Sequence, residues 1–410
     1  MKDNSGKHLK MKRKKIFFTH PDLTVTDLAK SFNMKLDNSI TEYFSGLTGK
    51  KYIIETYSCR SALYLAYSVI EKGEIITTPL TCHEALFPIV YTEKTPIYAD
   101  VEKKTLNFSA EKVERLITKK TKAIQAIHFG GNPCNLDELV NLATKKSLLL
   151  IEDCAQSLGS FYKGKSVGSF GDIACFSLSK NMDGIGGIFA TNNLEVYKKA
   201  LSHQDKFNDL SKSLVLYKLI RIILYTKRKY FLFDYLLRLL MKTRGNYLAG
   251  NIVGKISFEK NYCRKLPSIF KKINQYQLKK INNTLLKSAN IANLYNTVFM
   301  NTVNLNFQQN KNTITNGYCR YYIYSGKFNK DTADTLNKID IEVKHLKQEF
   351  GKYYQHKIKP DSAIYHKSLD NCKEYQDIHD KIIALPLHKF LRQKDISKIY
   401  ETITNQITLT

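Results

Sequence analysis

Short apolar runs typical of β-strands alternate with helical segments through the first half of the chain. The strand-like runs lie at 51–56, 74–78, 96–99, 122–128, 147–152, 172–177 and 187–191, and helical patterns at 61–71, 110–118 and 135–145 separate several of them. Strands alternating with helices predict a parallel sheet covered on both faces. We therefore expect an α/β fold with a mostly parallel sheet flanked by helices, in which ligands bind beyond the carboxyl ends of the strands.

The character of the chain changes after about residue 205. A segment at 214–241 is rich in Leu, Ile, Tyr and Phe with interspersed Lys and Arg, and predicts two helices broken near 226–229. A longer helix is expected from 273 to about 299, followed by a mixture of short strands, such as 320–325, and helices. The predicted division is a basic tail (1–15), a large α/β domain (16–205), a basic aromatic helical insert (206–265) and a small C-terminal α+β domain (266–410).

Charge and composition limit the class of protein. The 410 residues are 43% hydrophobic and 25% charged, which excludes a disordered, collagen-like or coiled-coil chain. The net charge is +27, and residues 205–280 contain 18 basic but only 4 acidic residues. Such a field attracts polyanions, whether nucleic acid, an anionic membrane surface or a phosphorylated substrate.

The eight cysteines are scattered through the chain. None forms a C-x-x-C pair and no His stands at zinc-finger spacing from one, so we expect no metal site and a reducing compartment. No apolar segment has the length of a secretory signal core or a spanning helix. These features predict a cytoplasmic protein.

Polar and reactive side chains gather at the ends of three predicted strands. The segments are Ser58-Cys-Arg-Ser61 before a helix, Ile151-Glu-Asp153 at the end of a buried run, and Phe176-Ser-Leu-Ser-Lys180 ahead of the glycines at 184–187. An isolated lysine after a strand is usually just exposed. Here Lys180 follows Ser177 and Ser179, and glycine-rich backbone could shelter it from water. Desolvation would free its amine as a nucleophile toward a carbonyl group.

Each of the other features has two interpretations. Asp153 either caps a following helix or faces a cationic ring nitrogen, as pyridoxal phosphate requires. The helix start at Ser58–Ser61 is either a phosphate site or an ordinary serine N-cap. His83 either stacks on a flat ring or serves as a polar residue in a turn. Together, in this order, the motifs have one economical account: a lysine Schiff base with pyridoxal phosphate.

With these motifs the chain resembles the DegT/DnrJ/StrS sugar aminotransferases, which are fold-type-I pyridoxal-phosphate enzymes. The resemblance runs from about residue 40 to 193 and is weaker from 276 onward. The segments that carry it are Ser58–Leu65, Thr77-Thr-Pro-Leu-Thr81, His128-Phe-Gly-Gly-Asn-Pro133, Ile151-Glu-Asp-Cys-Ala-Gln156, Val167-Gly-Ser-Phe-Gly-Asp172, Phe176–Asn181, Gly186-Gly187 and Leu385-Pro-Leu-His388.

The resemblance implies a role for each candidate residue. Lys180 would hold the cofactor and shuttle protons, and Asp153 would pair with the pyridine nitrogen. Gln156 would lie near the ring oxygen of the cofactor. Ser177 and the backbone of Arg60 and Ser61 would hold the phosphate.

The resemblance also implies partners and a reaction. It implies a homodimer that aminates a nucleotide-linked keto-sugar with glutamate as donor, in polysaccharide, lipopolysaccharide or glycoconjugate biosynthesis. Lys180 distinguishes the chain from relatives that carry a histidine there and act as dehydratases.

Several positions depart from the family pattern. Ser58-Cys-Arg60 stands where Ser-Gly-Thr is usual, the segment around the lysine is shorter, and Ile185 replaces a frequent Glu. Cys82 replaces an aromatic residue, which would leave ring stacking to His83. These departures motivate an alternative function: a non-catalytic binding or regulatory relative that sits on membrane or polyanions.

The basic aromatic segment leaves two interpretations open. Residues 212–244 either form an amphipathic element in peripheral contact with the inner face of a membrane, or a pair of core-packed helices with a solvated basic edge. Specific nucleic-acid binding is not expected, because no recognition motif is present.

Overall fold

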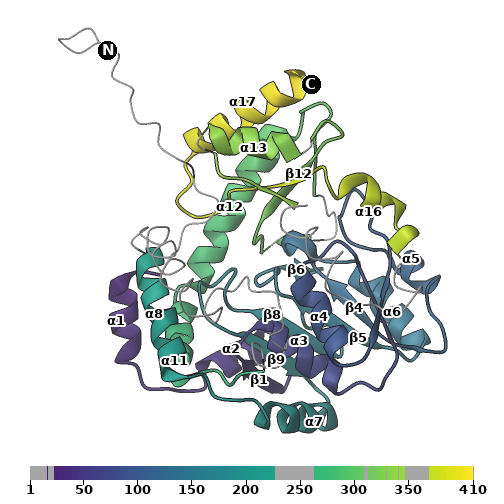
Figure 1. Ribbon diagram of the computed structural model, residues 1–410, viewed down its shortest axis with the longest axis vertical. Coiled ribbons are helices and arrows are strands. Elements are labelled where there is room, and N and C mark those ends of the chain that lie inside the picture. Colours follow the sequence, from purple (N-terminus) through teal and green to yellow (C-terminus); the bar gives the residue numbers. More distant parts are fainter. Residues whose placement is uncertain are drawn as a thin grey trace, which may run out of the picture.

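A seven-stranded sheet forms the centre of the larger part of the molecule (Figure 1). The computed structural model describes residues 16, 23–226, 263–308, 313–315, 317–328, 330–339, 341–346 and 369–409. In spatial order the strands are β1 (Tyr52–Thr56), β9 (Gly187–Thr191), β8 (Ile173–Ser177), β5 (Leu149–Cys154), β4 (Thr121–Ile127), β2 (Glu74–Thr77) and β3 (Thr95–Tyr98).

The pairing brings the carboxyl ends of three strands to one edge. β8, β5, β4, β2 and β3 are parallel to their neighbours, whereas β9 lies antiparallel between β1 and β8. The predicted α/β fold with a mostly parallel sheet is therefore confirmed. Because β9 is antiparallel to both β1 and β8, these two strands run the same way. Thr56 at the end of β1 and Ser177 at the end of β8 both pair with Gly187 of β9. Asp153 of β5 pairs with Cys175, which lies two residues before Ser177 on β8.

Helices cover both faces of this sheet, as the apolar runs require. On β4, Ala123 and Ile127 pack into one core with α3 (Cys59–Ser68) and α4 (His83–Tyr91). The alternate residues Ile124 and Ala126 pack into another core. Helices that contribute to the two faces also include α2 (Ser39–Thr48), α5 (Ala110–Glu114), α6 (Leu136–Lys145) and α7 (Leu194–Asp205).

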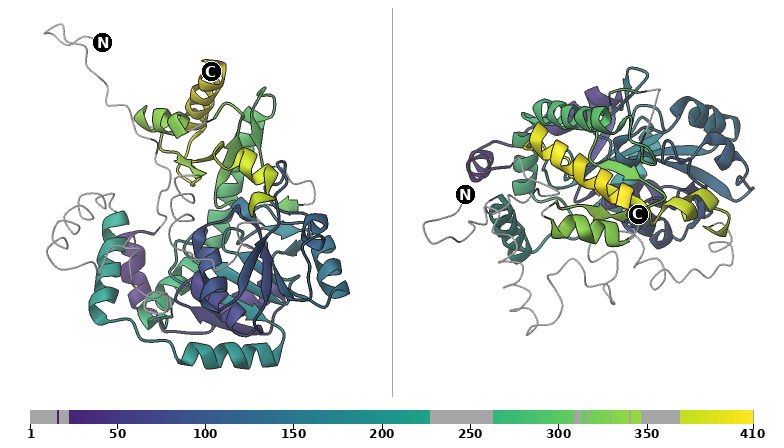
Figure 2. Two further views of the ribbon diagram at one scale, coloured as in Figure 1. Left: turned by 45° about the vertical axis from the view of Figure 1, so that its right-hand side comes forward. Right: turned by 90° about the horizontal axis from the view of Figure 1, so that it is seen from above.

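A second, antiparallel sheet organises the C-terminal part. Its strands, in order, are β10 (Asn306–Phe307), β12 (Tyr321–Tyr324), β14 (Ile382–Leu385) and β13 (Lys344–His345). Seen from above, α17 (Gln393–Leu409) runs between α12 (Ile281–Phe299) and α13 (Lys330–Lys338) (Figure 2, right). Ile16 forms a bridge with Ile341 in this second core. A small third sheet joins β11 (Thr313–Thr315) to β6 (Phe161–Tyr162) and β7 (Lys165–Ser166).

The single helix expected over 273–299 is wrong, because the chain forms α11 (Ser268–Leu278) and α12 with a break at Lys279–Lys280. α11 packs against α1 (Val25–Phe32) and α2. The apolar residues of α12 enter the second core instead. One straight helix could not serve both. The division into domains remains a prediction. These contacts favour a boundary between the large and the small domain within α12 rather than at residue 266.

The basic segment is described only in its first part. α8 (Lys212–Thr226) is the first of the two helices expected there, and it stands beside α1 (Figure 2, left). The second helix expected after 229 and the basic tail at 1–15 lie outside the described residues.

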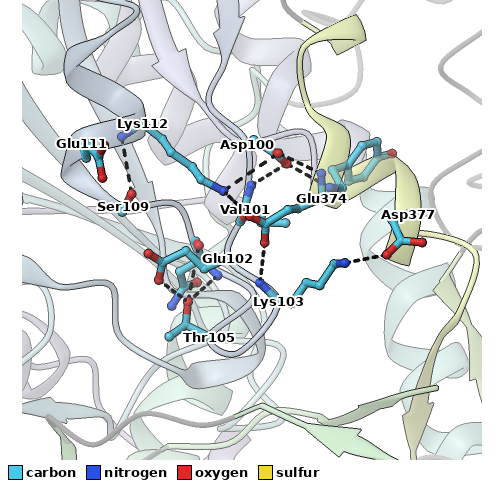
Figure 3. Close-up of polar contacts among 12 residues, drawn as sticks. Asp100, Val101, Glu102, Lys103, Thr105, Ser109, Glu111, Lys112, Glu374 and Asp377 are labelled. Carbon is cyan, nitrogen blue, oxygen red and sulfur yellow. Dashed lines mark hydrogen bonds and ion pairs between the residues drawn. The ribbon is translucent and has the colours of Figure 1, made fainter. Parts of the chain in front are cut away.

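A polar cluster fastens α16 (Lys373–Ile378) to the loop that follows β3 (Figure 3). The Asp100 carboxylate accepts hydrogen bonds from the backbone N–H groups of Glu374 and Tyr375, both at 2.9 Å. Lys112 donates to the backbone oxygen of Val101 at 2.6 Å and to Glu374 at 3.1 Å. Asp100 thus supplies, from a distant part of the chain, the acceptor that the first turn of a helix needs.

A second buried cluster holds the loop after β7 against β5. Glu152 is fully buried and accepts hydrogen bonds from the N–H groups of Gly168, Phe170 and Gly171 at 2.6–2.8 Å, while its Oε2 lies 3.2 Å from His128 Nε2. Burial alone would raise the pKa of Glu152, but the hydrogen bond from His128 and these backbone donors lower it. Cys154 Sγ lies close to both side chains. The bonds give Glu152 a structural role.

Replacing Asp100 by Ala should lower the free energy of unfolding by about 1–2 kcal/mol, because two N–H groups of α16 lose their acceptor. Urea titration of the purified protein measures this. The control is Asp377→Ala, which removes a half-exposed partner of Lys103 and should cost less than about 1 kcal/mol. Equal losses in the two variants would show that Asp100 does not fasten α16.

Glu152→Gln should destabilise the protein by roughly 2 kcal/mol or more, because the amide turns a donor toward backbone N–H groups. The folded-state pKa is lowered, so this contribution is present above the ordinary carboxyl pKa and fades as pH falls below about 4.3. Thermal unfolding at pH 7 and pH 4 checks both points against exposed Glu138→Gln. A loss no larger than in that control would contradict the role of Glu152.

Candidate active site

One pocket of about 530 Å³ lies at the edge where β1, β5 and β8 end. Its wall comes from the loops that leave these strands, from strand ends, from the loop after β2, from α3 and α4, and from one residue of α8. The polar and charged side chains and the tyrosine that line it are Tyr57, Ser58, Arg60, Thr81, Glu84, Asp153, Gln156, Ser177, Ser179, Lys180 and Lys218. Of the seven predicted site residues, Arg60, Asp153, Gln156, Ser177 and Lys180 line the pocket, whereas Ser61 and His83 do not.

Asp153 brings a buried carboxyl group into the pocket. Its Oδ1 accepts the N–H of Ala155 at 3.0 Å, and its Oδ2 accepts Gln125 Nε2 at 3.1 Å. Burial raises the pKa of Asp153, while the Ala155 N–H and the charge of Lys180 oppose the shift. Within the described parts of the chain Asp153 forms no ion pair, and a turn rather than a helix follows it. The helix-cap interpretation of Asp153 is therefore wrong.

Lys180 lies on the wall of the same pocket but is exposed in the single chain. The glycine-rich loop does not shelter it, contrary to expectation, because that loop folds toward α11. Asn274 of α11 accepts the N–H of Ile185 and donates to its carbonyl oxygen, both at 2.8 Å. A Cβ on Gly186, whose φ is +129°, would lie 2.7 Å from the carbonyl oxygen of Thr56. The loop thus closes against strand and helix and leaves Lys180 uncovered.

Two serine hydroxyls and an amide complete the polar wall near Lys180. Ser177 Oγ lies 3.1 Å from Ser179 Oγ, and both hydroxyls line the pocket. Gln156 Oε1 accepts the N–H of Gly130 at 3.2 Å, which fixes the amide. A pair of hydroxyls beside a lysine can bind an oxyanion such as a phosphate group.

The start of α3 is capped by its own serine. Ser58 Oγ accepts the N–H of Ser61 at 3.2 Å and lies 2.9 Å from Ser61 Oγ. Ser58 is therefore an ordinary N-cap of α3. Its hydroxyl already accepts the Ser61 N–H, which the family resemblance assigns to the phosphate of the cofactor. Ser61 itself is buried within α3, so its phosphate role stays a prediction.

Arg60 enters the pocket as part of an ion pair. Its guanidinium group bonds to Glu84, whose other oxygen lies 3.2 Å from His83 Nε2. Burial raises the pKa of Glu84, but His83 and Arg60 outweigh it and hold that pKa at about 2. The His83 ring also contacts Phe87 edge-on, with centroids 5.1 Å apart. The His83 ring is thus held by two residues of its own helix, Glu84 and Phe87. Its predicted role of stacking on the cofactor ring stays a prediction.

Sequence reasoning missed several pocket residues. Ser179 was noted beside Lys180 in the sequence but given no role, and Glu84 was not named although it directly follows His83; adjacency to predicted residues was the signal that could have assigned both. Lys218 was visible only as one of many basic residues in the segment after 205. No sequence pattern places it at the pocket, because α8 reaches the site only through tertiary packing.

α8 buries its apolar side against the protein. Val215, Leu219, Ile222 and Ile223 pack around a core that contains Tyr57 and Leu266. Among the described residues, no helix combines the length and apolarity needed to cross a membrane.

Comparison with known proteins identifies the family. The model of the DegT/DnrJ/EryC1/StrS aminotransferase family matches residues 31–404. GDP-perosamine synthase of Escherichia coli O157:H7 is 42% identical over 140 residues, covering 33% of this chain and 38% of that protein. The chain thus spans about two fifths of the length of the curated relatives that it matches.

Solved structures share the whole fold at low sequence identity. Helicobacter pylori PseC, described as an aminotransferase involved in the biosynthesis of pseudoaminic acid, has a TM-score of 0.72 at 20% identity and covers 97% of this chain and 100% of its own. The PLP-form of a putative sugar aminotransferase from Streptococcus pneumoniae has a TM-score of 0.68 at 18% identity, covering 96% and 98%. The fold is therefore that of these aminotransferases, and the chain belongs to the DegT/DnrJ/EryC1/StrS aminotransferase family.

Proposed function

We propose that the protein is a pyridoxal-phosphate-dependent aminotransferase that aminates a nucleotide-linked keto-sugar, with glutamate as amino donor. The reaction would supply amino sugars for surface polysaccharides, including lipopolysaccharide, or for glycoconjugates. The observation that carries the proposal is the meeting of Asp153 and Lys180 on one pocket wall. Family membership and the GDP-sugar enzyme among the relatives support the substrate class.

The pocket residues fit pyridoxal phosphate. Asp153 is 3% exposed and has a raised pKa, so it lacks a full counter-charge. A protonated pyridine nitrogen would supply one, which relieves the cost of a buried carboxylate. Ser177, Ser179 and the first turn of α3 would hold the phosphate group. The cavity has the size usual for a small-molecule site.

The bound cofactor would supply an electron sink for the carbanion that develops at the amino-bearing carbon. Lys180 Nζ would hold the cofactor and move the proton between that carbon and its neighbour. Asp153 would keep the ring nitrogen protonated. Overall, the amino group of glutamate replaces the keto oxygen of the sugar. Water supplies the keto oxygen of 2-oxoglutarate in the first half-reaction, and the keto oxygen of the sugar leaves as water in the second, so atoms and electrons balance.

A non-catalytic relative is not favoured. That alternative rests on the altered Ser58-Cys59-Arg60 and the shortened lysine loop. Arg60 lines the pocket together with Lys180, and the loop closes without displacing the lysine from the wall. The expected chemical groups are thus retained.

Oligomeric state and location form part of the proposal. Lys180 and Ser179 are exposed in the single chain, so a second copy that covers this wall would complete the site. A homodimer in the cytoplasm is what we propose, with a sedimentation mass near twice 47.3 kDa. Lipid contact through 212–244 has less support, because the described helix α8 buries apolar residues in the protein. Specific nucleic-acid binding is not proposed.

Lys180→Ala should abolish the visible absorbance band of the protein-bound cofactor and lower amination at least about a thousandfold, because the reactive amine is removed. Borohydride reduction of the wild type followed by peptide mass mapping should place the cofactor on Lys180. Asp153→Asn should keep the protein folded and weaken cofactor binding about tenfold or more.

The matched control is Lys165→Ala, an exposed lysine on β7 away from the pocket. It should keep both the band and the activity. A reduced cofactor found on another lysine, or a band that persists in Lys180→Ala before any amine is added, would refute the assignment. A wild-type spectrum that glutamate leaves unchanged would refute the donor.

A further inference from the structure

α8 contributes a second lysine to the pocket that the transamination chemistry does not use. Lys218 Nζ lies 5.0 Å from the centroid of the Tyr57 ring, a cation–π contact. Both residues line the pocket that also contains Asp153 and Lys180. Val215, Leu219 and Ile222 pack α8 against the core under Tyr57, so the helix fixes where the lysine side chain can reach.

The charged groups that act on Lys218 among the described residues are basic. No carboxylate in the described parts of the chain forms an ion pair with it, and its charged neighbours are Arg221 and Arg60. Burial, Arg221 and Arg60 together lower the pKa of Lys218 to about 8. Arg60 differs, because Glu84 balances it. A half-buried ammonium group beside other positive charges costs free energy unless an anion joins it.

We propose that Lys218 binds the diphosphate group of the nucleotide-linked substrate and so helps select that substrate over a free keto-sugar. This inference rests on the proposed function. It assigns to Lys218 the binding of the diphosphate that joins the sugar to the nucleoside. Lys218 acts as a binding residue on the wall supplied by α8, whereas Lys180 carries the chemistry.

A diphosphate suits this position better than the carboxylate of the amino donor. Lys218 lines the pocket next to Arg60, which Glu84 balances, and the charge of Arg221 also acts on Lys218. One carboxylate carries a single negative charge, whereas a diphosphate carries at least two. The lysine ammonium is a compact point charge, which is a common partner of a phosphate oxygen.

The test measures binding of guanosine diphosphate and uridine diphosphate to the full chain loaded with pyridoxal phosphate, by titration calorimetry. Lys218→Met should weaken binding of the diphosphate probes about tenfold or more, and Lys218→Arg should largely restore it. Guanosine and uridine, which lack phosphate, should bind equally to all variants. Lys212→Met removes the same charge from an exposed site on α8 and should leave binding unchanged.

The pH dependence gives a second readout. Lys218 is charged below its pKa, so diphosphate affinity should be highest below about pH 8 and should fall above it, and Lys218→Arg should remove that fall. The other titratable groups facing the pocket are Tyr57, Arg60, Glu84, Asp153, Lys180 and the thiols of Cys59 and Cys82. They are shared by both proteins, so the difference between the two profiles belongs to Lys218.

Failure of this inference differs from failure of the proposed function. Conversion of the cofactor spectrum by glutamate involves no diphosphate, so Lys218→Met should retain it. Loss of that conversion with unchanged diphosphate binding would overturn the inference and assign Lys218 to the donor carboxylate. Diphosphate binding that is equal in wild type and Lys218→Met, or absent from the wild type, would also overturn it.

Discussion

The buried carboxyl group of Asp153 is the constraint around which the site is arranged. It stands near the end of β5, out of water, with one backbone N–H and one glutamine amide as partners. Neither partner carries a full positive charge, so the group is costly in the absence of a cation. The sheet order places β8 next to β5, and this neighbour delivers Ser177, Ser179 and Lys180 to the same edge.

The rigidity of this edge comes from residues that do not enter the pocket. Glu152, next to Asp153 on β5, points to the other face of the sheet and binds the loop at 168–171. Asp153 lines the pocket and Glu152 holds the neighbouring loop, because successive side chains of a strand face opposite sides of the sheet. Asn274 of α11 fixes the loop after Lys180 in the same way. The backbone that carries the exposed Lys180 therefore lies next to a loop whose position is fixed by hydrogen bonds.

Part of the positive charge of the chain lies at the pocket, on Lys218 of α8. A net charge of +27 attracts any polyanion and indicates no particular one. The packing of α8 turns one of its lysines toward the pocket and buries its apolar residues in protein. Under our proposal, Lys218 of this segment binds the phosphorylated substrate, while the apolar residues of α8 pack in the protein.

The sequence by itself determined the strands of the large sheet, its mostly parallel pairing and the family, because apolar periodicity and motif order are local properties of the chain. It also placed Asp153, Ser177 and Lys180 at strand ends. Only the tertiary structure decided that Lys180 is exposed, that residues 268–299 form two helices, and that Lys218 faces the pocket. Each of these depends on contacts between distant segments, Asn274 with Ile185 or α8 with Tyr57, whose partners leave no periodic trace in the sequence.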